Sequence, residues 1–488
     1  MKLSEVTLSH HYADLGDAFG TRIAPTPFRH PRLIDTNPAV LRLLGIDPEE
    51  ATNPAWAQLG SGAKLFKGSQ PFAMKYAGHQ FGVYNPDLGD GRALLLGEIE
   101  QAGRRWELHL KGAGLTPYSR FGDGRAVLRS TLREYLAGEA LSGLGIRSTR
   151  ALCIVGSDEP VTREQIEHGA MLIRVAESHV RFGHFEYLFY TKQLQALQQL
   201  IGEICKRFVA DSQGLSAGGQ AEVLLRFTTR RSAELVANWQ AEGFAHGVLN
   251  TDNMSIIGDT FDYGPYAFLD DYDPAYICNH SDHTGRYAFA QQPGVVLWNL
   301  NALAHALSAV VDVEILRDCL EQFQPMVTDA YAARMRAKLG LATEEESDHK
   351  LCAALLQLLQ HSTADYALFF RALARYRGER PASALREQIP PAQHGELAQW
   401  LAHYDSRLAR ENSDARRRSL AMLAANPKYI LRNYLAQKVI EAAENGDYHP
   451  LRTLRRLLQS PFEEHPQHEV WAIAPPESAK RIPLSCSS

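Results

Sequence analysis

Hydrophobic and polar positions alternate in a short segment within the first quarter of the chain. In residues 105–111, every second side chain from Trp106 to Leu110 is apolar, which is the period of a β-strand with one buried face. A second apolar segment, 92–99, precedes it and is separated from it by the turn-forming residues 101–103. The pattern therefore predicts a β-hairpin.

The apolar spacing then changes to that of a helix. A glycine-punctuated loop, 112–124, comes first, and from Arg125 apolar residues recur three or four positions apart until Gly143. After Met171 the pattern is mostly helical. The apolar stretch 295–316 is interrupted by polar residues and predicts a buried helix, not a membrane span.

A β-rich first part that leads into a helical second part is typical of a two-lobed, protein-kinase-like fold of the α+β class. A loop-rich polar block, 246–286, lies between the helices of the second part. The expected parts are an N-terminal extension (1–60), a nucleotide-binding N-lobe (61–168), a helical C-lobe that holds the metal and catalytic loop (169–410), and a C-terminal helical extension and tail (411–488).

Composition narrows the possible partners. The 488 residues are 45% hydrophobic and 22% charged, as in ordinary globular proteins, and the net charge is −5. Because no positive field attracts phosphate backbones or anionic lipid, we expect no nucleic acid and no membrane partner. Six cysteines without paired spacing argue against structural zinc, and we expect a cytoplasmic protein.

The most informative stretch runs from His246 to Asn253 and is followed by Asp262-Tyr263-Gly264. A kinase catalytic loop begins with His and ends with Asn, and a metal-binding Asp-Phe-Gly triplet follows it. Carboxamide and carboxylate oxygens are the ligands that Mg²⁺ or Mn²⁺ takes when it bridges phosphates. The spacing predicts a metal pair, Asn253 and Asp262, and a β-hairpin between them over 254–259.

One position departs from the kinase pattern. Val248 stands where a kinase keeps the aspartate that accepts the proton of the incoming hydroxyl. Asp252 is the nearby carboxylate able to take over that role. A polar loop that merely caps helices is the alternative interpretation of this block.

Features upstream favour nucleotide chemistry. Lys111 ends a predicted strand and Glu134 lies on the next helix, the order of the kinase lysine–glutamate ion pair. A first glycine-rich loop, 88–92, would let backbone N–H groups approach phosphates, and a plain hairpin turn is its alternative interpretation. A second loop, 120–125, has a Gly-Asp-Gly insertion that kinases lack between the strand lysine and the helix, and two arginines can bind phosphates. These residues are Gly89, Gly91 and Arg92 in the first loop, Asp123 and Gly124 in the second, and the arginines Arg174 and Arg181.

Longer motifs resemble those of the selenoprotein O family, which includes the bacterial YdiU proteins. They are Lys-Gly-Ala-Gly-Leu-Thr-Pro-Tyr-Ser-Arg from Lys111, Phe-Gly-Asp-Gly-Arg from Phe121, His-Gly-Val-Leu-Asn-Thr-Asp-Asn from His246 and Asp-Tyr-Gly-Pro from Asp262. The resemblance covers essentially the whole chain. It implies a pseudokinase-like fold that binds ATP in an inverted orientation and transfers AMP, or UMP from UTP, to Ser, Thr or Tyr of protein substrates.

The resemblance also implies residue roles. Lys111 and Glu134 form the nucleotide-orienting pair, Asn253 and Asp262 bind Mg²⁺ or Mn²⁺, and Asp252 accepts the proton. The remaining residues line the nucleotide pocket or hold the phosphates: Gly89, Gly91, Arg92, Asp123, Gly124, Arg174 and Arg181. Animal members carry selenocysteine where this chain has Cys486, which suggests a reversible disulfide between Cys278 and Cys486; two unrelated thiols remain the alternative.

Three other functions stay open at this point. An atypical kinase would use Asp252 as its base. A non-catalytic pseudokinase scaffold would bind nucleotide without transferring any group, as the valine at position 248 favours. A metallohydrolase would use the acidic and histidine residues of the polar block: Asp270, Asp271, Asp273, His280, Asp282 and His283.

Overall fold

The computed structural model describes residues 1–488 except 379–381, 412, 481, 483 and 485–488. It combines helices with an antiparallel sheet of eight strands in the order β1-β3-β6-β7-β10-β9-β2, with β8 paired to β10. The strands are β1 (Gly20–Arg22), β2 (Arg32–Thr36), β3 (Phe72–Met74), β6 (Ala93–Gln101), β7 (Arg104–Lys111), β8 (Ala126–Val127), β9 (Arg150–Thr162) and β10 (Ile166–Ala176).

The hairpin predicted from the alternation forms the middle of this sheet as β6 and β7. Its turn residues Ala102 and Gly103 have φ values of 51° and 75°, the backbone that suits a two-residue hairpin turn. The expectation of one buried face is wrong, because Glu107 and His109 are buried as well as Leu108 and Leu110. Both faces of the hairpin are covered by other parts of the chain.

The expected N-terminal extension is part of the sheet. It supplies the edge strands β1 and β2, and its helices α1 (Pro38–Leu43) and α2 (Ala55–Gly60) contribute to the apolar cluster that contains Leu108 and Leu110. The boundary expected after residue 168 falls inside β10, whose pairing with β7 and β9 continues to Ala176. The sheet-bearing part therefore ends about eight residues later than the sequence suggested, because continuous strand pairing holds β10 together.

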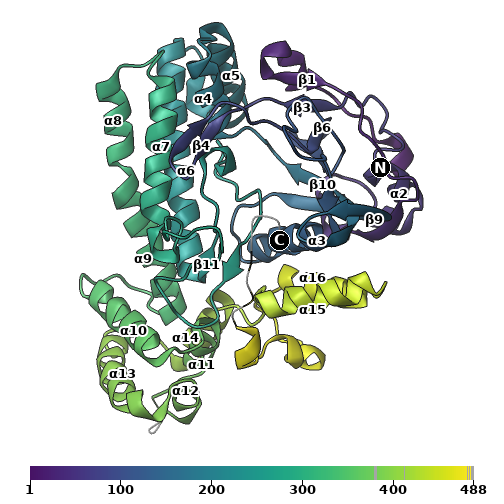
Figure 1. The fold of residues 1–488 in the computed structure, drawn as a ribbon. Helices are drawn as coiled ribbons and strands as arrows, with labels where there is room; N and C mark the ends of the chain where they lie inside the picture. The colour runs from purple at the N-terminus through teal and green to yellow at the C-terminus, as the bar shows by residue number, and fades with distance from the viewer. Residues whose placement is uncertain (379–381, 412, 481, 483, 485–488) are drawn as a thin grey trace.

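Helix α3 (Leu128–Gly143) contacts β9 and β10 with one side and the C-terminal helices α15 (Asn433–Glu444) and α16 (His449–Gln459) with the other. Figure 1 shows α15 and α16 side by side below α3. A Cβ added at Gly143 would lie 1.9 Å from the carbonyl oxygen of Leu458, so only glycine permits this approach. Arg455 of α16 also pairs with Asp35 of β2 at 3.0 Å.

The second part of the chain is helical, as its pattern predicts. Figure 1 shows the long helices α5 to α9 standing beside the sheet, with α10 to α14 gathered below them. Among the described residues, no helix combines the length and the hydrophobicity needed to cross a membrane. The helices are α4 (Phe182–Tyr190), α5 (Leu194–Phe208), α6 (Ala217–Glu242), α7 (Gln292–Leu307), α8 (Val313–Glu321), α9 (Phe323–Leu339), α10 (Asp348–Ser362), α11 (Tyr366–Leu373), α12 (Ser383–Arg386), α13 (His394–Leu408) and α14 (Ala415–Ala425).

The hairpin predicted over 254–259 is wrong. Backbone groups of this segment bond to other parts of the chain: Ile256 donates to the carbonyl of Val180 at 3.1 Å, and Phe182 donates to that of Met254 at 3.0 Å. The strands nearby are β11 (Phe244–Ala245) and β12 (Ala267–Phe268), which pair with each other. Long-range partners, which no local pattern encodes, replace the expected local pairing.

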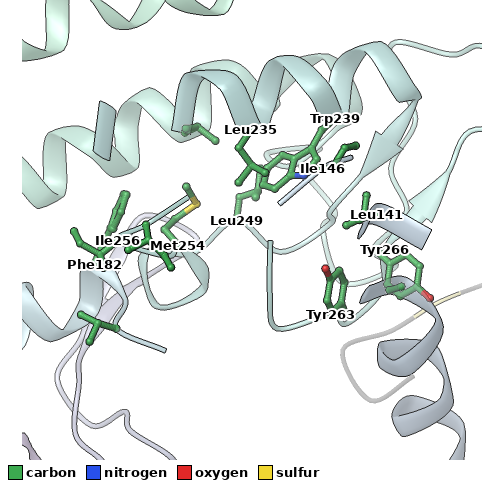
Figure 2. Close-up of a cluster of buried hydrophobic side chains, with 14 of the residues drawn as sticks. Leu141, Ile146, Phe182, Leu235, Trp239, Leu249, Met254, Ile256, Tyr263 and Tyr266 are labelled. Atoms are coloured by element: carbon green, nitrogen blue, oxygen red, sulfur yellow. The ribbon is translucent and has the colours of Figure 1, made fainter. Parts of the chain in front are cut away.

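The polar block is anchored by its few apolar residues (Figure 2). Leu249, Met254 and Ile256 are at most 2% exposed and lie in a cluster with Leu235 and Trp239 of α6. The same cluster includes residues of α3 and of the sheet, so one core joins the two parts of the molecule. Packing on both sides fixes the loop, which is a requirement for precise placement of polar groups.

Two short hairpin strands, β4 (Gly78–Gln80) and β5 (Val83–Asn85), form a separate two-stranded sheet. Strand β4 contacts α4 and the 3₁₀ turn Thr251–Asn253 at the end of the polar loop. This hairpin therefore lies against the segment in which the sequence predicts the catalytic chemistry.

Candidate active site

The loop 246–253 is held by buried hydrogen bonds at its first residue, His246. His246 donates its backbone N–H to Gln292 at 2.9 Å, and its Nε2 lies 3.0 Å from the carbonyl oxygen of Phe261, just before Asp262. Burial lowers the pKa of His246 to about 4, so the ring is neutral at pH 7. The histidine therefore connects the loop to the Asp262 segment and is too far buried to meet a substrate.

Asn253 and Asp262 line the same cavity from the two segments. The Asn253 amide nitrogen donates to the carbonyl of Val248 at 3.1 Å, which leaves its carboxamide oxygen available as a ligand atom. Asp262 has a φ of 59°, a backbone conformation that aspartate tolerates better than most residues. Its carboxylate is paired with two guanidiniums, that of Arg174 at 2.8 Å and that of Arg181.

A buried ion-pair chain links the helix α3 to the sheet. Glu134 of α3 pairs with Lys111 at the end of β7 and with Arg174 of β10, the latter at 2.7 Å. Burial alone would raise the pKa of Glu134, but the two cations hold it well below its ordinary value. Glu134 does not itself line the cavity; it lies behind Lys111 and Arg174, which do.

Asp252 is a buried carboxylate that lines the cavity. Its Oδ2 accepts a hydrogen bond from the side chain of Gln80 at 3.3 Å, whereas its buried Oδ1 has no hydrogen-bond partner among the described residues. Burial raises the pKa of Asp252 to about 6, and the nearby charge of Arg181 opposes the shift. Such a carboxylate can accept a proton near neutral pH.

The cavity has a volume of about 960 Å³ and is strongly basic. Seven arginine and lysine side chains line it against four carboxylates, an excess that favours a polyanion. Of these cations, Arg92 and Arg120 have no ion-pair partner among the described residues, whereas the other five do. The seven are Arg92, Lys111, Arg120, Arg125, Arg163, Arg174 and Arg181.

The glycine-rich loops that line this cavity are closely packed. A Cβ at Gly91 would lie 2.8 Å from the carbonyl oxygen of Tyr118, and one at Gly124 would lie 2.1 Å from that of Gly114. Glycine is therefore required there for loop-on-loop packing. Asp123 is tied by Arg163, whose two guanidinium nitrogens lie 2.8 and 3.0 Å from its carboxylate oxygens.

Cys278 packs against the loop 246–253, since a Cβ at Gly247 would lie 2.6 Å from its sulfur. Its predicted partner, Cys486, lies outside the described residues. Nearby, the backbone N–H of His280 donates to the carbonyl of Leu484 at 2.8 Å. The C-terminal segment thus reaches the stretch that contains Cys278.

The geometry counts against the metallohydrolase alternative. Asp270 pairs with Arg432, Asp271 pairs with Lys480 at 3.0 Å, and Asp282 accepts the backbone N–H groups of a local turn. Within the part of the chain that the structure describes, no three His, Cys, Asp or Glu side chains gather as metal ligands. Asp270, Asp271 and Asp282 therefore make structural contacts.

Comparison with known proteins identifies the family. Residues 2–459 match the family model described as Protein adenylyltransferase SelO. The chain belongs to the SelO family. Among relatives described as Protein nucleotidyltransferase YdiU, that of Pseudomonas fluorescens is 51% identical over 490 residues, which is 100% of this chain and 99% of the relative. Those of Pseudomonas aeruginosa and Azotobacter vinelandii are each 50% identical, over 100% of this chain and 99% and 100% of the relative.

Membership of the SelO family makes the chain a transferase of the nucleotidyltransferase class. The sequence motifs named the family correctly, because long unusual stretches in the same order are specific. Of the residues predicted for the nucleotide and metal site, all but Glu134 line one cavity. They are Gly89, Gly91, Arg92, Lys111, Asp123, Gly124, Arg174, Arg181, Asp252, Asn253 and Asp262.

Sequence reasoning missed several residues of this SelO-family site. Asp90, between the two glycines of the first loop, is 3% exposed and pairs with His109 of β7 at 2.8 Å. Gln80, which contacts Asp252, and Arg163, which holds Asp123, were also missed. The one available signal was the position of Asp90 between two glycines. The residues that contact each other in these pairs are distant in sequence, and no sequence pattern connects them.

Proposed function

We propose that this SelO-family chain transfers AMP from ATP to a hydroxyl group of a protein side chain, that of Ser, Thr or Tyr, and releases pyrophosphate. One observation carries the proposal: a cavity with excess positive charge is lined by Asp252, a buried carboxylate with an oxygen that accepts no hydrogen bond from a described residue. The excess positive charge attracts a polyphosphate, and the Asp252 carboxylate can accept the proton of a hydroxyl group.

A kinase-like two-lobed arrangement is the fold that we propose for this chemistry. It is supported by the lysine on strand β7 paired with the glutamate on the next helix, and by the order of the loop residues Asn253 and Asp262. The sheet-bearing part would correspond to the N-lobe and the helices from α4 onward to the C-lobe. The chain departs from a kinase at Val248.

In the proposed step, the acceptor hydroxyl gives its proton to Asp252 while its oxygen forms a bond to the α-phosphorus of ATP. The bond between that phosphorus and the oxygen bridging it to the β-phosphorus breaks, and pyrophosphate leaves with the bridging oxygen. Lys111, Arg174 and Arg181 supply positive charge along the phosphates, which offsets charge that develops on the leaving group. Val248 takes no part, because its side chain can neither accept a proton nor donate one.

Asn253 and Asp262 are the residues that would hold a divalent cation, Mg²⁺ or Mn²⁺. Their oxygens suit a hard cation, and two protein ligands suffice because such an ion completes its shell with phosphate oxygens and water. When bound, the ion supplies charge neutralisation at the phosphates. The protein's contribution is to keep both side chains on one cavity wall, through the bond from Asn253 to Val248 and the ion pairs of Asp262.

The donor and the cellular location are part of this proposal. We propose ATP as the main donor, with UTP as the second nucleotide to be compared, and a cytoplasmic location. Neither nucleic acid nor a membrane is a proposed partner.

The decisive experiment follows labelled phosphate. The protein is incubated with Mg²⁺ or Mn²⁺ and with ATP labelled at either the α- or the γ-phosphate, and label on protein is counted. We expect incorporation from the α position, its loss in Asp262→Ala, and a strong reduction in Lys111→Ala. Parallel reactions with α-labelled UTP measure the donor preference.

The same assay separates the remaining alternatives. Label that arrives only from the γ-phosphate would establish an atypical kinase with Asp252 as its base. Nucleotide binding by calorimetry without transfer from either position would establish a non-catalytic scaffold. Both outcomes contradict the proposed transfer of AMP.

A further inference from the structure

A second cavity of about 960 Å³ lies beside the first and is lined mainly by apolar side chains. Three of them, Phe81, Ile277 and Trp298, are 41%, 43% and 37% exposed, although they are large and apolar. The two cavities adjoin, because Gln80 lines the first and the next residue, Phe81, lines the second. Exposed aromatic and aliphatic residues gathered around a groove mark a surface that binds another protein.

One wall of this groove, the β4–β5 hairpin, is hydrogen-bonded to the proposed catalytic loop. Residues 79–81 at the end of the β4–β5 hairpin each donate a hydrogen bond to one of residues 250–252. The bonds are His79 N–H to Thr251 Oγ1 at 2.6 Å, Gln80 Nε2 to Asp252 Oδ2 at 3.3 Å, and Phe81 N–H to Asn250 Oδ1 at 3.2 Å. The groove therefore has a constant position relative to Asp252.

Phe81 is held with its ring presented to the groove. Its φ of 50° is unfavourable for an aromatic residue, and such conformations persist where the surroundings determine them. The ring packs on that of Tyr287, with centroids 4.9 Å apart, and the Tyr287 hydroxyl accepts from the Phe81 N–H at 3.1 Å. Two hydrogen bonds and one ring contact thus keep a large apolar side chain at the surface.

Arg286 gives the groove a charge. Its guanidinium lies over the ring of Trp298, 5.0 Å from the centroid, and close to Gly82 of the hairpin. Among the described residues no carboxylate pairs with Arg286, although most arginines beside the first cavity have such a partner. A guanidinium stacked on an indole ring is well suited to bind a carboxylate from a partner.

We propose that this groove binds an extended segment of the acceptor protein, with a large apolar side chain between Phe81 and Trp298 and an acidic side chain at Arg286. The proposal rests on the proposed function, since it supplies the substrate class for the same site. An extended chain rises about 3.3 Å per residue, so residues two to four positions from the modified hydroxyl lie about 7–13 Å from it, and these are the positions we propose for the groove. The enzyme would then select hydroxyls by their neighbours in sequence.

A degenerate peptide library tests this directly. Each peptide carries one central Ser, Thr or Tyr, the flanking positions are fixed one at a time, and label from α-labelled ATP is counted. The wild-type protein is expected to favour large apolar and acidic residues at flanking positions by about tenfold. Arg286→Glu is expected to replace the acidic preference by a preference for Lys or Arg, and Trp298→Ala to raise the KM for peptide without changing the KM for ATP.

Leu420→Ala, which removes another exposed apolar side chain on helix α14, is the matched control and should behave as the wild type. Thermal unfolding of every variant checks that the fold is kept. Identical flanking preferences in wild type and Arg286→Glu, or labelling of whole proteins but of no peptide, would overturn the groove while leaving AMP transfer intact. A wild-type protein that transfers no α-label to any acceptor overturns the proposed function itself.

One competing occupant is the C-terminal segment of the chain, which reaches His280. A variant that ends at Lys480 distinguishes binding of the C-terminal segment from binding of the acceptor protein. If removal of the last eight residues alone raises peptide labelling and Arg286→Glu has no effect on preference, the groove belongs to that segment and the acceptor proposal is wrong.

Discussion

The carboxylates of Glu134 and Asp262 are held by one guanidinium, that of Arg174, at 2.7 and 2.8 Å. Glu134 comes from helix α3, and Asp262 comes from the loop that follows the predicted metal asparagine. One 2%-exposed arginine therefore couples the position of the helix to that of the predicted metal ligand. A substitution of either carboxylate should therefore change the position of the other.

Glu134→Gln tests this coupling. The substitution leaves Lys111 and Arg174 buried with one counter-charge fewer, and removing one partner of a buried ion pair costs about 3–5 kcal/mol. We expect the free energy of unfolding in urea to fall by that amount and α-label transfer to be lost. Glu314→Gln, at an exposed surface pair of helix α8, should change neither. A Glu134→Gln protein of wild-type stability would contradict the interpretation of this network.

Asp90 provides a pH-dependent contribution to stability. Burial would raise its pKa, but the contact with His109, the charge of Arg181 and the N–H of Met74 lower the pKa to about 2. Since the unfolded chain binds this proton at higher pH, the contribution is complete above about pH 4 and is lost as the pH falls to about 2. Asp90→Asn should therefore cost about 2 kcal/mol at pH 7.

The measurement is the difference in unfolding free energy between Asp90→Asn and wild type across pH 7 to 3. The difference should be constant down to about pH 4 and then shrink. Asp318→Asn, at an exposed position of α8, serves as the control. A difference that grows on acidification would show that the sign is wrong.

Val248→Asp restores the aspartate found in kinases. If the α-phosphate is the one that reacts, a carboxylate at this position creates no γ-phosphoryl transfer. It also adds negative charge to the cavity, and we expect the KM for ATP to rise by about tenfold. The same paired α- and γ-label assay is the measurement. Transfer of γ-label by this variant alone would favour the kinase alternative.

The proposed disulfide between Cys278 and Cys486 is tested with an oxidant such as hydrogen peroxide. Two thiols would lose two protons and two electrons to the peroxide, and the contact between Leu484 and His280 keeps the C-terminal segment near Cys278. We expect faster non-reducing migration of the oxidised wild type, reversed by dithiothreitol. Cys486→Ser should lack the shift, and Cys352→Ser should keep it. Equal migration of wild type and Cys486→Ser would remove this proposal.

Local patterns predicted the parts of the fold that depend on neighbours in sequence. The β6–β7 hairpin and helix α3 were found from their periods of two and of about four. The apolar stretch 295–316 was predicted as one buried helix, but the structure divides it between α7 and α8, with residues 308–312 outside both helices. The burial of Glu107 and His109, the edge strands from the first 36 residues and the pairing of 254–260 depend on distant partners. A single sequence contains no signal for those.

The candidate site also combines features that local sequence predicts with features that depend on distant partners. Motif order predicted loops whose residues line one cavity in the structure, and Lys111 does pair with Glu134. The contacts of Asp252 with Gln80 and of Asp90 with His109 join segments 172 and 19 residues apart, so the sequence offers no spacing from which to infer them. The second cavity was missed because its exposed aromatics come from two segments about 200 residues apart, and each alone resembles an ordinary surface residue.

The packing of α16 against α3 has a consequence for synthesis on the ribosome. Helix α3 leaves the exit tunnel more than 300 residues before α16 does, and Asp35 emerges some 420 residues before its partner Arg455. The helix that bears Glu134 therefore keeps its outer face uncovered until α16 has been synthesised. Nascent chains should stay inactive until then, and a chaperone that shields α3 would act during this interval.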